Sequence, residues 1–179
     1  MKSFLLSCFI GIGLLTVGCN LLKIDDPKPK LPPITMTGAN TFGAIVNGKV
    51  WVPISKLNQG AIHQTSDLLQ IFAELESVKN EIDQNINIVI SGEPVIPAIY
   101  HFDSKSNNTN RIVEWQDDIT DCNYSFRSSS STYYWGKVEI LKLDNANRIV
   151  SGTFEFTISV EGCPDIRVEQ GRFDLKLIN

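Results

Sequence analysis

The chain is poor in the residues that most often carry out catalysis and metal binding. Its 179 residues include only two histidines, His63 and His101, and four cysteines. No glycine-rich phosphate loop, nucleophile elbow, paired-histidine motif or EF-hand loop is present. Sixteen Lys and Arg face 20 Asp and Glu, and the basic residues form no run. Nucleic-acid binding requires clustered positive charge, so we expect no nucleic-acid partner, and nothing points to a metal or a cofactor.

The longest uncharged run lies at the N-terminus, from Phe4 to Val17, behind the single positive charge of Lys2. It is shorter than the roughly 20 residues that a helix needs to cross a bilayer. A short apolar run behind one positive charge is typical of a secretory signal that is removed. We therefore assign residues 1–18 to a signal peptide and leave them out of the folded domain.

The run ends in Leu15-Thr16-Val17-Gly18-Cys19, which resembles the lipobox of bacterial lipoproteins. That resemblance implies that Cys19 carries acyl chains such as palmitate and becomes the first residue of the mature protein. Ordinary signal-peptidase cleavage after Gly18 is the alternative, because Thr16 and Gly18 also suit that enzyme. We expect a protein of the bacterial cell envelope, attached by lipid to the outer membrane, on either its periplasmic or its surface side.

A proline-rich stretch follows, from residue 19 to residue 38. Its prolines are Pro27, Pro29, Pro32 and Pro33. Proline fixes φ and biases the preceding residue toward extended conformations, so this stretch predicts a semi-rigid spacer between the lipid and a folded part. Residues 39–179 are enough for a single domain that can bury a sizeable core.

Two cysteines remain once Cys8 leaves with the signal and Cys19 is acylated. Cys122 and Cys163 then lie in an oxidising compartment, where disulfides persist. A metal pair or a reactive thiol is the alternative. A metal site would need two further ligands, and neither histidine is near a cysteine in the sequence. We therefore expect a Cys122–Cys163 disulfide.

The folded part is predicted to consist of β-strands. In residues 149–160, Phe154, Phe156 and Ile158 alternate with polar residues, which is the period of a half-buried strand. Similar short segments occur at residues 68–75, 85–91, 96–102, 135–143 and 166–177. Eight or more such strands with hairpin-sized connections indicate an all-β antiparallel sandwich. A flattened antiparallel β-barrel of the lipocalin type is the alternative.

Three local features refine this expectation. Asn47-Gly48 between two β-rich runs predicts a two-residue hairpin, because a type I′ turn needs positive φ at both central positions. The apolar parity shifts between Ile140 and Leu141, which suggests a bulge. Residues 75–82 could form either one short helix or a loop.

Several segments together resemble a family. They are Asn40 to Gly43, Val46 to Trp51, Ile149 to Phe156 and Gly171 to Phe173. These segments look like those of a set of uncharacterised lipoproteins from Bacteroidetes-type bacteria. The resemblance implies an all-β, lipid-anchored domain of unknown function, and it supplies no catalytic residues.

One aromatic cluster stands out as a candidate binding site. Tyr133, Tyr134 and Trp135 are consecutive at the start of a predicted strand, and Trp115 lies upstream. Exposed aromatic faces stack on sugar rings and dominate the energy of many interfaces. The alternative is that some of these side chains face the core as the strand begins.

The remaining chemistry is sparse. A serine hydrolase would need His63 or His101 to pair with a serine and an acid. Asp117, Asp118 and Asp121 could contribute oxygens to Ca²⁺, but the spacing lacks the EF-hand glycine and glutamate, so we expect a solvated loop here.

Three functions are therefore open. The first is a non-enzymatic binding or structural module with a protein or glycan partner. The second is a hydrolase whose site is assembled from separated strands. The third is a lipocalin-like carrier of a small ligand.

Overall fold

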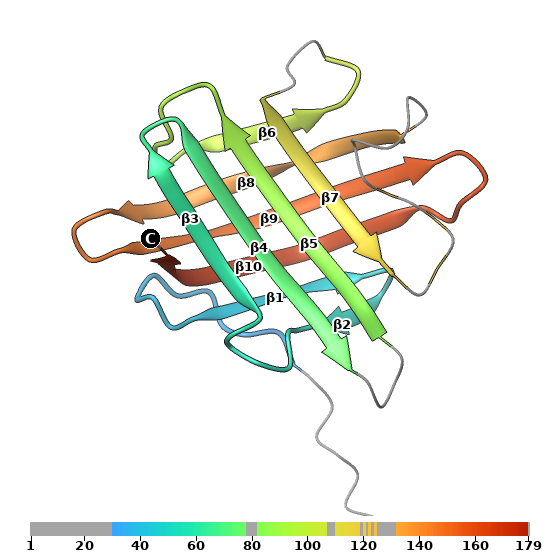
Figure 1. The fold of residues 1–179 in the computed structure, drawn as a ribbon, viewed down its shortest axis with the longest axis horizontal. Coiled ribbons are helices and arrows are strands. Elements are labelled where there is room, and N and C mark those ends of the chain that lie inside the picture. The colour runs from blue at the N-terminus through green and yellow to red at the C-terminus, as the bar shows by residue number, and fades with distance from the viewer. Residues whose placement is uncertain are drawn as a thin grey trace, which may run out of the picture.

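The computed structural model describes residues 30–77, 82–106, 110–118, 120, 122, 124 and 132–178. The signal peptide, Cys19 and the first part of the proline-rich stretch lie outside the described residues. Within the described ranges all regular structure is β (Figure 1). The strands are β1 (Thr41–Val46), β2 (Lys49–Trp51), β3 (Gln59–Thr65), β4 (Leu68–Ser77), β5 (Ile82–Ser91), β6 (Ile99–Asp103), β7 (Arg111–Asp117), β8 (Thr132–Asp144), β9 (Ile149–Val160) and β10 (Ile166–Ile178).

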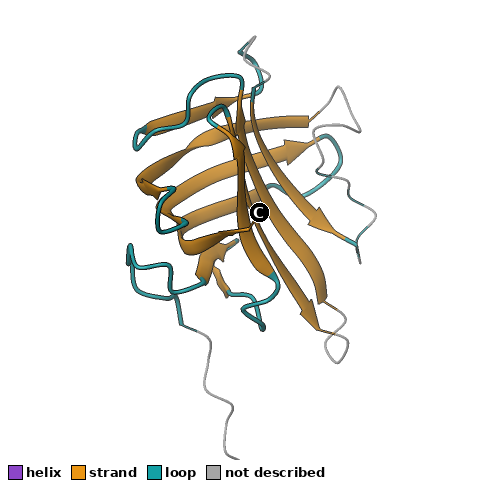
Figure 2. Ribbon diagram, turned by 60° about the vertical axis from the view of Figure 1, so that its left-hand side comes forward, coloured by secondary structure: helices purple, strands orange, loops and turns teal. Residues whose placement is uncertain are grey.

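The strands form one continuous sheet in the order β6-β8-β9-β10-β3-β4-β5-β7, and β1 pairs with both β10 and β2. All strand pairs are antiparallel except β10 and β3, which run parallel where Leu177 meets Ala61 and Ile178 meets Ile62. Figures 1 and 2 show the result as two layers whose strands cross, with the core between them.

The all-β expectation is confirmed, but the antiparallel sandwich is wrong. The two layers are parts of one mixed sheet that curls into a nearly closed barrel. The reason lies in β10, which outruns β1 and uses its last residues to pair with β3. A parallel junction this short does not change the alternation of apolar and polar residues in either strand, so it cannot be recognised in the sequence.

The barrel stays open along one seam, between the edge strands β6 and β7. No ladder joins these two strands in the described part of the chain. Arg111 of β7 crosses the seam instead. Its Nη1 donates to the carbonyl of His101 at 3.4 Å, and its guanidinium lies 5.3 Å from the centre of the Tyr100 ring. Side chains therefore close the gap that the backbone leaves.

The local expectations are confirmed where the structure tests them. Asn47 and Gly48 have φ of 47° and 78° and connect β1 to β2. The register of β8 against β9 shifts between Ile140 and Lys142, at the predicted bulge.

The region between residues 75 and 82 contains no helix in its described part. Leu75 pairs with Gln84 and Ser77 with Ile82, so β4 and β5 form a hairpin. Val78, which the helical alternative required, lies outside the described residues. The apolar spacing here arose from two adjoining strands rather than from a helical face.

An aromatic cluster occupies the centre of the core. The Phe154 ring lies 5.1 Å from Phe42, 6.1 Å from Phe156 and 6.3 Å from Phe173, measured between ring centres. Gly171 of β10 is required here because a Cβ at this position would lie 2.5 Å from the Phe154 ring. Ring and glycine therefore fit each other, and the strands approach closely at this point.

The N-terminal segment is held against the domain by Asp174 of β10, which is 1% exposed. Its carboxylate accepts hydrogen bonds from the Thr35 hydroxyl (2.6 Å) and from the backbone N–H groups of Thr37 (2.9 Å), Gly38 (2.6 Å) and Ala39 (3.2 Å). Burial by itself would raise the pKa of this carboxyl, but the hydrogen bonds outweigh it and the pKa is lowered. The C-terminal end of the stretch expected as a semi-rigid spacer, from Thr35 to residue 38, is thus fixed to the sheet.

We predict that Phe154→Ala lowers the free energy of unfolding by about 3–5 kcal/mol, because the substitution removes buried surface and leaves a cavity. Phe154 is 3% exposed. Thr153→Ala, on the other face of β9, should stay within about 0.5 kcal/mol. Urea unfolding of both variants is the measurement, and equal losses would contradict this assignment of faces.

We also predict that Asp174→Asn costs about 2 kcal/mol or more, because hydrogen bonds to a charged group are lost and buried N–H groups are left poorly paired. A lowered pKa stabilises the fold above the unfolded value of about 3.9, and this contribution disappears as the pH falls through the folded-state value. The variant should therefore lose part of the acid dependence of stability below about pH 4.

Urea unfolding between pH 2 and pH 7 measures this effect, and limited proteolysis should cut residues 30–39 faster in Asp174→Asn. The exposed Asp165 supplies the control, since Asp165→Asn removes the same charge from the surface. Identical acid profiles for Asp174→Asn and the unmodified protein would contradict the proposed role of Asp174.

Candidate functional site

The aromatic cluster predicted from the sequence is divided by the alternation of β8. Tyr134 points inward, and its hydroxyl donates to the carbonyl of Arg111 at 3.4 Å. Tyr133 and Trp135 point outward and are 47% and 50% exposed. Trp115 of β7 is buried at 2% exposure. Two of the four candidate residues are therefore on one outer surface, and the other two belong to the interior.

The buried pair serves the core. Burial raises the pKa of Tyr134, and the negative charges of Glu114 and Asp103 raise it further, so its hydroxyl stays protonated. The Trp115 ring lies 6.1 Å from that of Trp51, measured between ring centres. Neither Tyr134 nor Trp115 shares a surface with the outward pair.

A shallow groove of about 350 Å³, which we call the outer groove, lies beside Trp135 on the outside of β8, β9 and β10. It is lined by Trp135, Gly136, Glu155, Phe156, Thr157, Arg167, Val168 and Glu169. The register of the strands creates it, because Trp135 pairs with Thr157 and Thr157 pairs with Arg167. Directly opposed residues in antiparallel strands have Cβ atoms only about 5 Å apart, so these three side chains form one row.

Three of the polar side chains of the outer groove are free to bind a ligand. The guanidinium of Arg167, the carboxylate of Glu169 and the hydroxyl of Thr157 have no hydrogen-bond or ion-pair partner among the described residues. Glu155 is engaged by Lys137 at 3.2 Å. A half-exposed indole beside unpaired donors and acceptors suits a ligand with an apolar face and many hydroxyl groups.

Tyr133 extends this aromatic surface along the same strand. Residues two apart in a strand are separated by about 7 Å and face the same side, so Tyr133 and Trp135 project from the same face of β8. The ammonium group of Lys105 lies 5.3 Å from the centre of the Tyr133 ring. One face of Tyr133 is thus partly occupied by a cation, and Trp135 is the more open of the two rings.

The histidines considered for catalysis and the aspartates considered for Ca²⁺ binding have separate local partners. His63 Nδ1 lies 2.9 Å from Oδ1 of Asn145, and the exposed His101 is on edge strand β6. Asp117 accepts a hydrogen bond from Gln84, whereas the Asp118 carboxylate accepts one from Gln116. Asp121 lies outside the described residues. No group of three or more His, Cys, Asp or Glu that could hold a metal ion occurs among the described residues.

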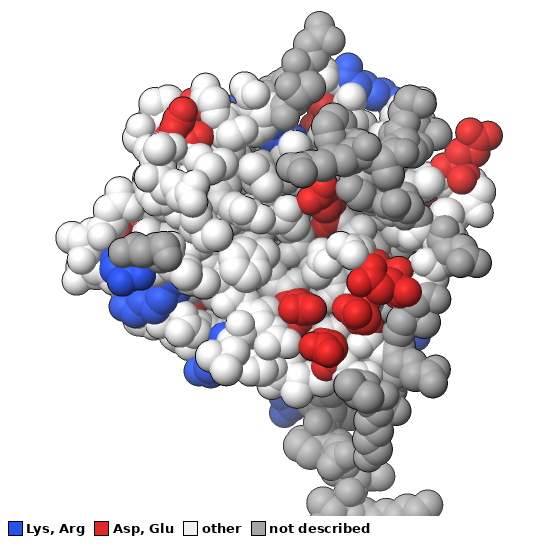
Figure 3. All heavy atoms as spheres, in the orientation of Figure 1, with Lys and Arg blue, Asp and Glu red and all other residues white. Residues whose placement is uncertain are grey.

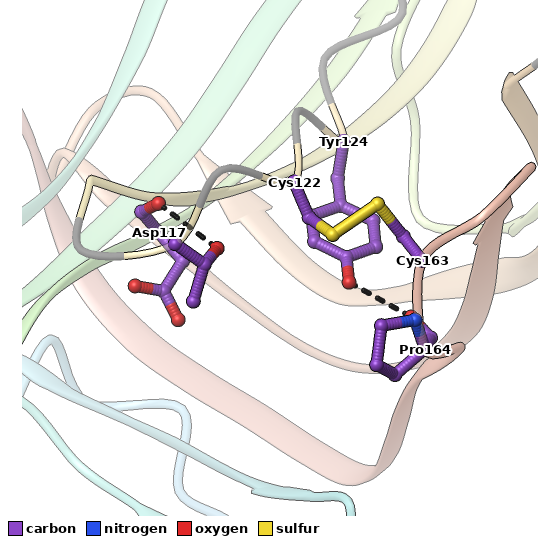
Figure 4. Close-up of a disulfide and its surroundings, with 6 residues drawn as sticks. Asp117, Cys122, Tyr124, Cys163 and Pro164 are labelled. Atoms are coloured by element: carbon purple, nitrogen blue, oxygen red, sulfur yellow. Dashed lines mark hydrogen bonds between the residues drawn. A yellow bond between two sulfur atoms is a disulfide. The ribbon is translucent and has the colours of Figure 1, made fainter.

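The expected disulfide is present between Cys122 and Cys163, with Cα atoms 5.9 Å apart (Figure 4). It ties the segment after β7 to the turn between β9 and β10. Beside it, the Tyr124 hydroxyl donates to the carbonyl of Pro164 at 2.8 Å. In the chain-entropy description a bridge over 41 residues stabilises by about 4 kcal/mol. The bridge also takes both cysteines out of consideration as metal ligands or free thiols.

The opposite outer face, formed by β4, β5 and β7, has a different character. Acidic side chains gather on it in Figure 3, among them the exposed Glu74, Glu76 and Asp118. Amides link its strands, as where Asn87 Nδ2 donates to Glu114 at 2.8 Å. Negative charge on this face repels polyanions, whereas the outer groove carries both signs of charge.

Sequence reasoning found Trp135 and Tyr133 but missed Thr157, Arg167 and Glu169. The alternation of residues 149–160 already placed Thr157 outward, but only the pairing of β9 with β8 and β10 places it next to Trp135. Comparison of the chain with family models, curated proteins and solved structures finds no match. In the described ranges no helix is long and apolar enough to cross a membrane.

Proposed function

We propose that this chain is a lipid-anchored, non-enzymatic binding domain of the bacterial envelope, and that it binds a glycan at the outer groove. The observation that carries the proposal is the row formed by Trp135, Thr157 and Arg167. An exposed indole can stack on the apolar face of a sugar ring. The hydroxyl and guanidinium beside it can then bind the hydroxyl groups at the rim of that ring.

The alternatives have less support. A hydrolase needs a base and a nucleophile within hydrogen-bond reach, and His63 is engaged by Asn145 instead. A lipocalin-like carrier needs an enclosed cavity in the middle of the barrel. That space is filled by side chains with no exposed surface, among them Leu69, Ile71, Ile88 and Leu175.

The decisive test is Trp135→Ala in a binding assay against soluble polysaccharides and cell-wall fragments. Loss of a stacked indole should weaken glycan binding at least tenfold, since tryptophans in such positions typically contribute 2 kcal/mol or more. Isothermal titration calorimetry measures the affinity. Ile99→Ala is the matched control, because Ile99 is an equally exposed apolar side chain on β6, and its loss should leave binding unchanged. A glycan that binds both variants equally well would contradict the proposal.

The lipid anchor and membership of the lipoprotein family are two separate proposals. The first rests on the lipobox-like segment that ends in Cys19, and the second rests on the segments that resemble the family. Cys19→Ala should move the protein from the membrane fraction to the soluble fraction, because no acyl chain can then be attached. Fractionation of cells followed by mass spectrometry of the N-terminus measures this. A non-acylated mature chain that begins at Cys19 would overturn the assignment.

A further inference from the structure

A second hollow lies at the end of the barrel where β2 meets the β4–β5 hairpin and the end of β7. We call it the end cleft, and its volume is about 420 Å³. β2 is only three residues long, and all three of its residues line the cleft. Apolar side chains dominate its wall, including Val46, Leu75, Ile82 and Ile166. Small-molecule sites commonly measure 300–1,000 Å³, so the cleft has the size of a ligand site.

A short chain of hydrogen bonds fixes the polar side of the end cleft. Trp51 Nε1 donates to Gln84 Oε1 at 3.2 Å, and Gln84 Nε2 donates to Asp117 Oδ2 at 2.9 Å. This arrangement orients the Gln84 amide and leaves one of its two N–H hydrogens for another acceptor.

Trp115 also lines the cleft, and it breaks the usual rule for buried polar groups. Its side chain is 2% exposed, yet its indole N–H has no hydrogen-bond partner in the part of the chain that the structure describes. A buried donor without an acceptor destabilises the folded protein, and native proteins rarely keep one without a reason. Trp51, its neighbour in the same wall, has its donor satisfied by Gln84.

We propose that the end cleft binds a small, uncharged molecule with an apolar body and an oxygen acceptor. The Trp115 Nε1 atom has almost no exposed surface, so its N–H donates to this acceptor once the ligand has displaced the side chains that cover it. The apolar wall takes the body of the ligand. Asp117 and Lys49 place one charge of each sign at the cleft, so its lining favours neither an anion nor a cation by net charge. A neutral carbonyl or hydroxyl compound fits these constraints.

This site is independent of the outer groove. Trp115 and Gln84 face the interior between the layers, whereas Trp135 and Arg167 are on the outside of β8 and β10. Either proposal can therefore fail without affecting the other.

The test uses prodan, a neutral naphthalene ketone whose fluorescence reports an apolar environment, with the purified mature protein. We expect saturable binding that weakens about tenfold in Trp115→Phe, which keeps an aromatic ring but removes the donor. Trp135→Phe is the matched control on the outer groove and should bind prodan as the unmodified protein does. Anilinonaphthalene sulfonate, which has a related ring system and a negative charge, should bind at least tenfold more weakly than prodan.

A second measurement uses the unmodified protein, so it does not depend on whether a cleft variant folds. The indole N–H resonance of Trp115 should move on addition of prodan, while that of Trp135 should not. Failure of the unmodified protein to bind prodan, equal affinity of Trp115→Phe, or equal affinity for the sulfonate would each overturn the proposal. An experimental structure in which another part of this chain, or a second copy, fills the cleft would overturn it as well.

Discussion

The structure depends above all on how β10 divides its hydrogen bonds. Along one side it pairs with β9 over most of its length, and along the other it pairs first with β1 and then, in parallel, with β3. Without its pairing to β3 the two layers would be separate sheets. β10 also has an irregular stretch between Val168 and Gly171, within the part that pairs with β1 and before the change of partner, and Gln170 adopts a φ of 51° there. Such bulges bend and twist a strand.

The outer groove, the end cleft, the aromatic core and the N-terminal segment each contact a different part of β10. Arg167 belongs to the outer groove and Ile166 to the end cleft. Gly171 and Phe173 pack against Phe154 in the core. Asp174 holds the N-terminal segment. A change in β10 that shifts its register by one residue would therefore exchange inward and outward side chains at all of these places.

The features that could be predicted from the sequence are those that neighbouring residues determine. The Asn47-Gly48 turn, the bulge near Ile140 and the inward face of β9 follow from local backbone preferences and from period-two alternation. The Cys122–Cys163 bridge followed because few alternatives exist for two cysteines. The parallel junction of β10 and β3 could not be predicted, because only two residue pairs make it.

The candidate sites show the same difference between features that neighbouring residues determine and features that distant strands determine. Alternation requires that Tyr133 and Trp135 share one side and Tyr134 the other, but it does not say which side is buried. Burial depends on which strands lie opposite, and that is a property of the whole sheet. The neighbours of Trp135 come from β9 and β10, and the wall of the end cleft joins Trp51 to Gln84 and Trp115, which are distant in sequence. No short segment contains either arrangement.

The hydrogen bonds to Asp174 also determine how a mechanical load would enter the domain. A pull on the chain before Thr35 meets the Pro32 carbonyl, which accepts a hydrogen bond from Arg172, and then the bonds to the carboxylate of Asp174. Several bonds from adjacent residues, Thr35 to Ala39, share that load in parallel, so no single bond has to carry it. The first residue of β1, Thr41, pairs with the same Asp174. A load on the N-terminal segment is therefore taken up in part by β10, in the middle of the sheet, before it separates Thr41 from its partner strand.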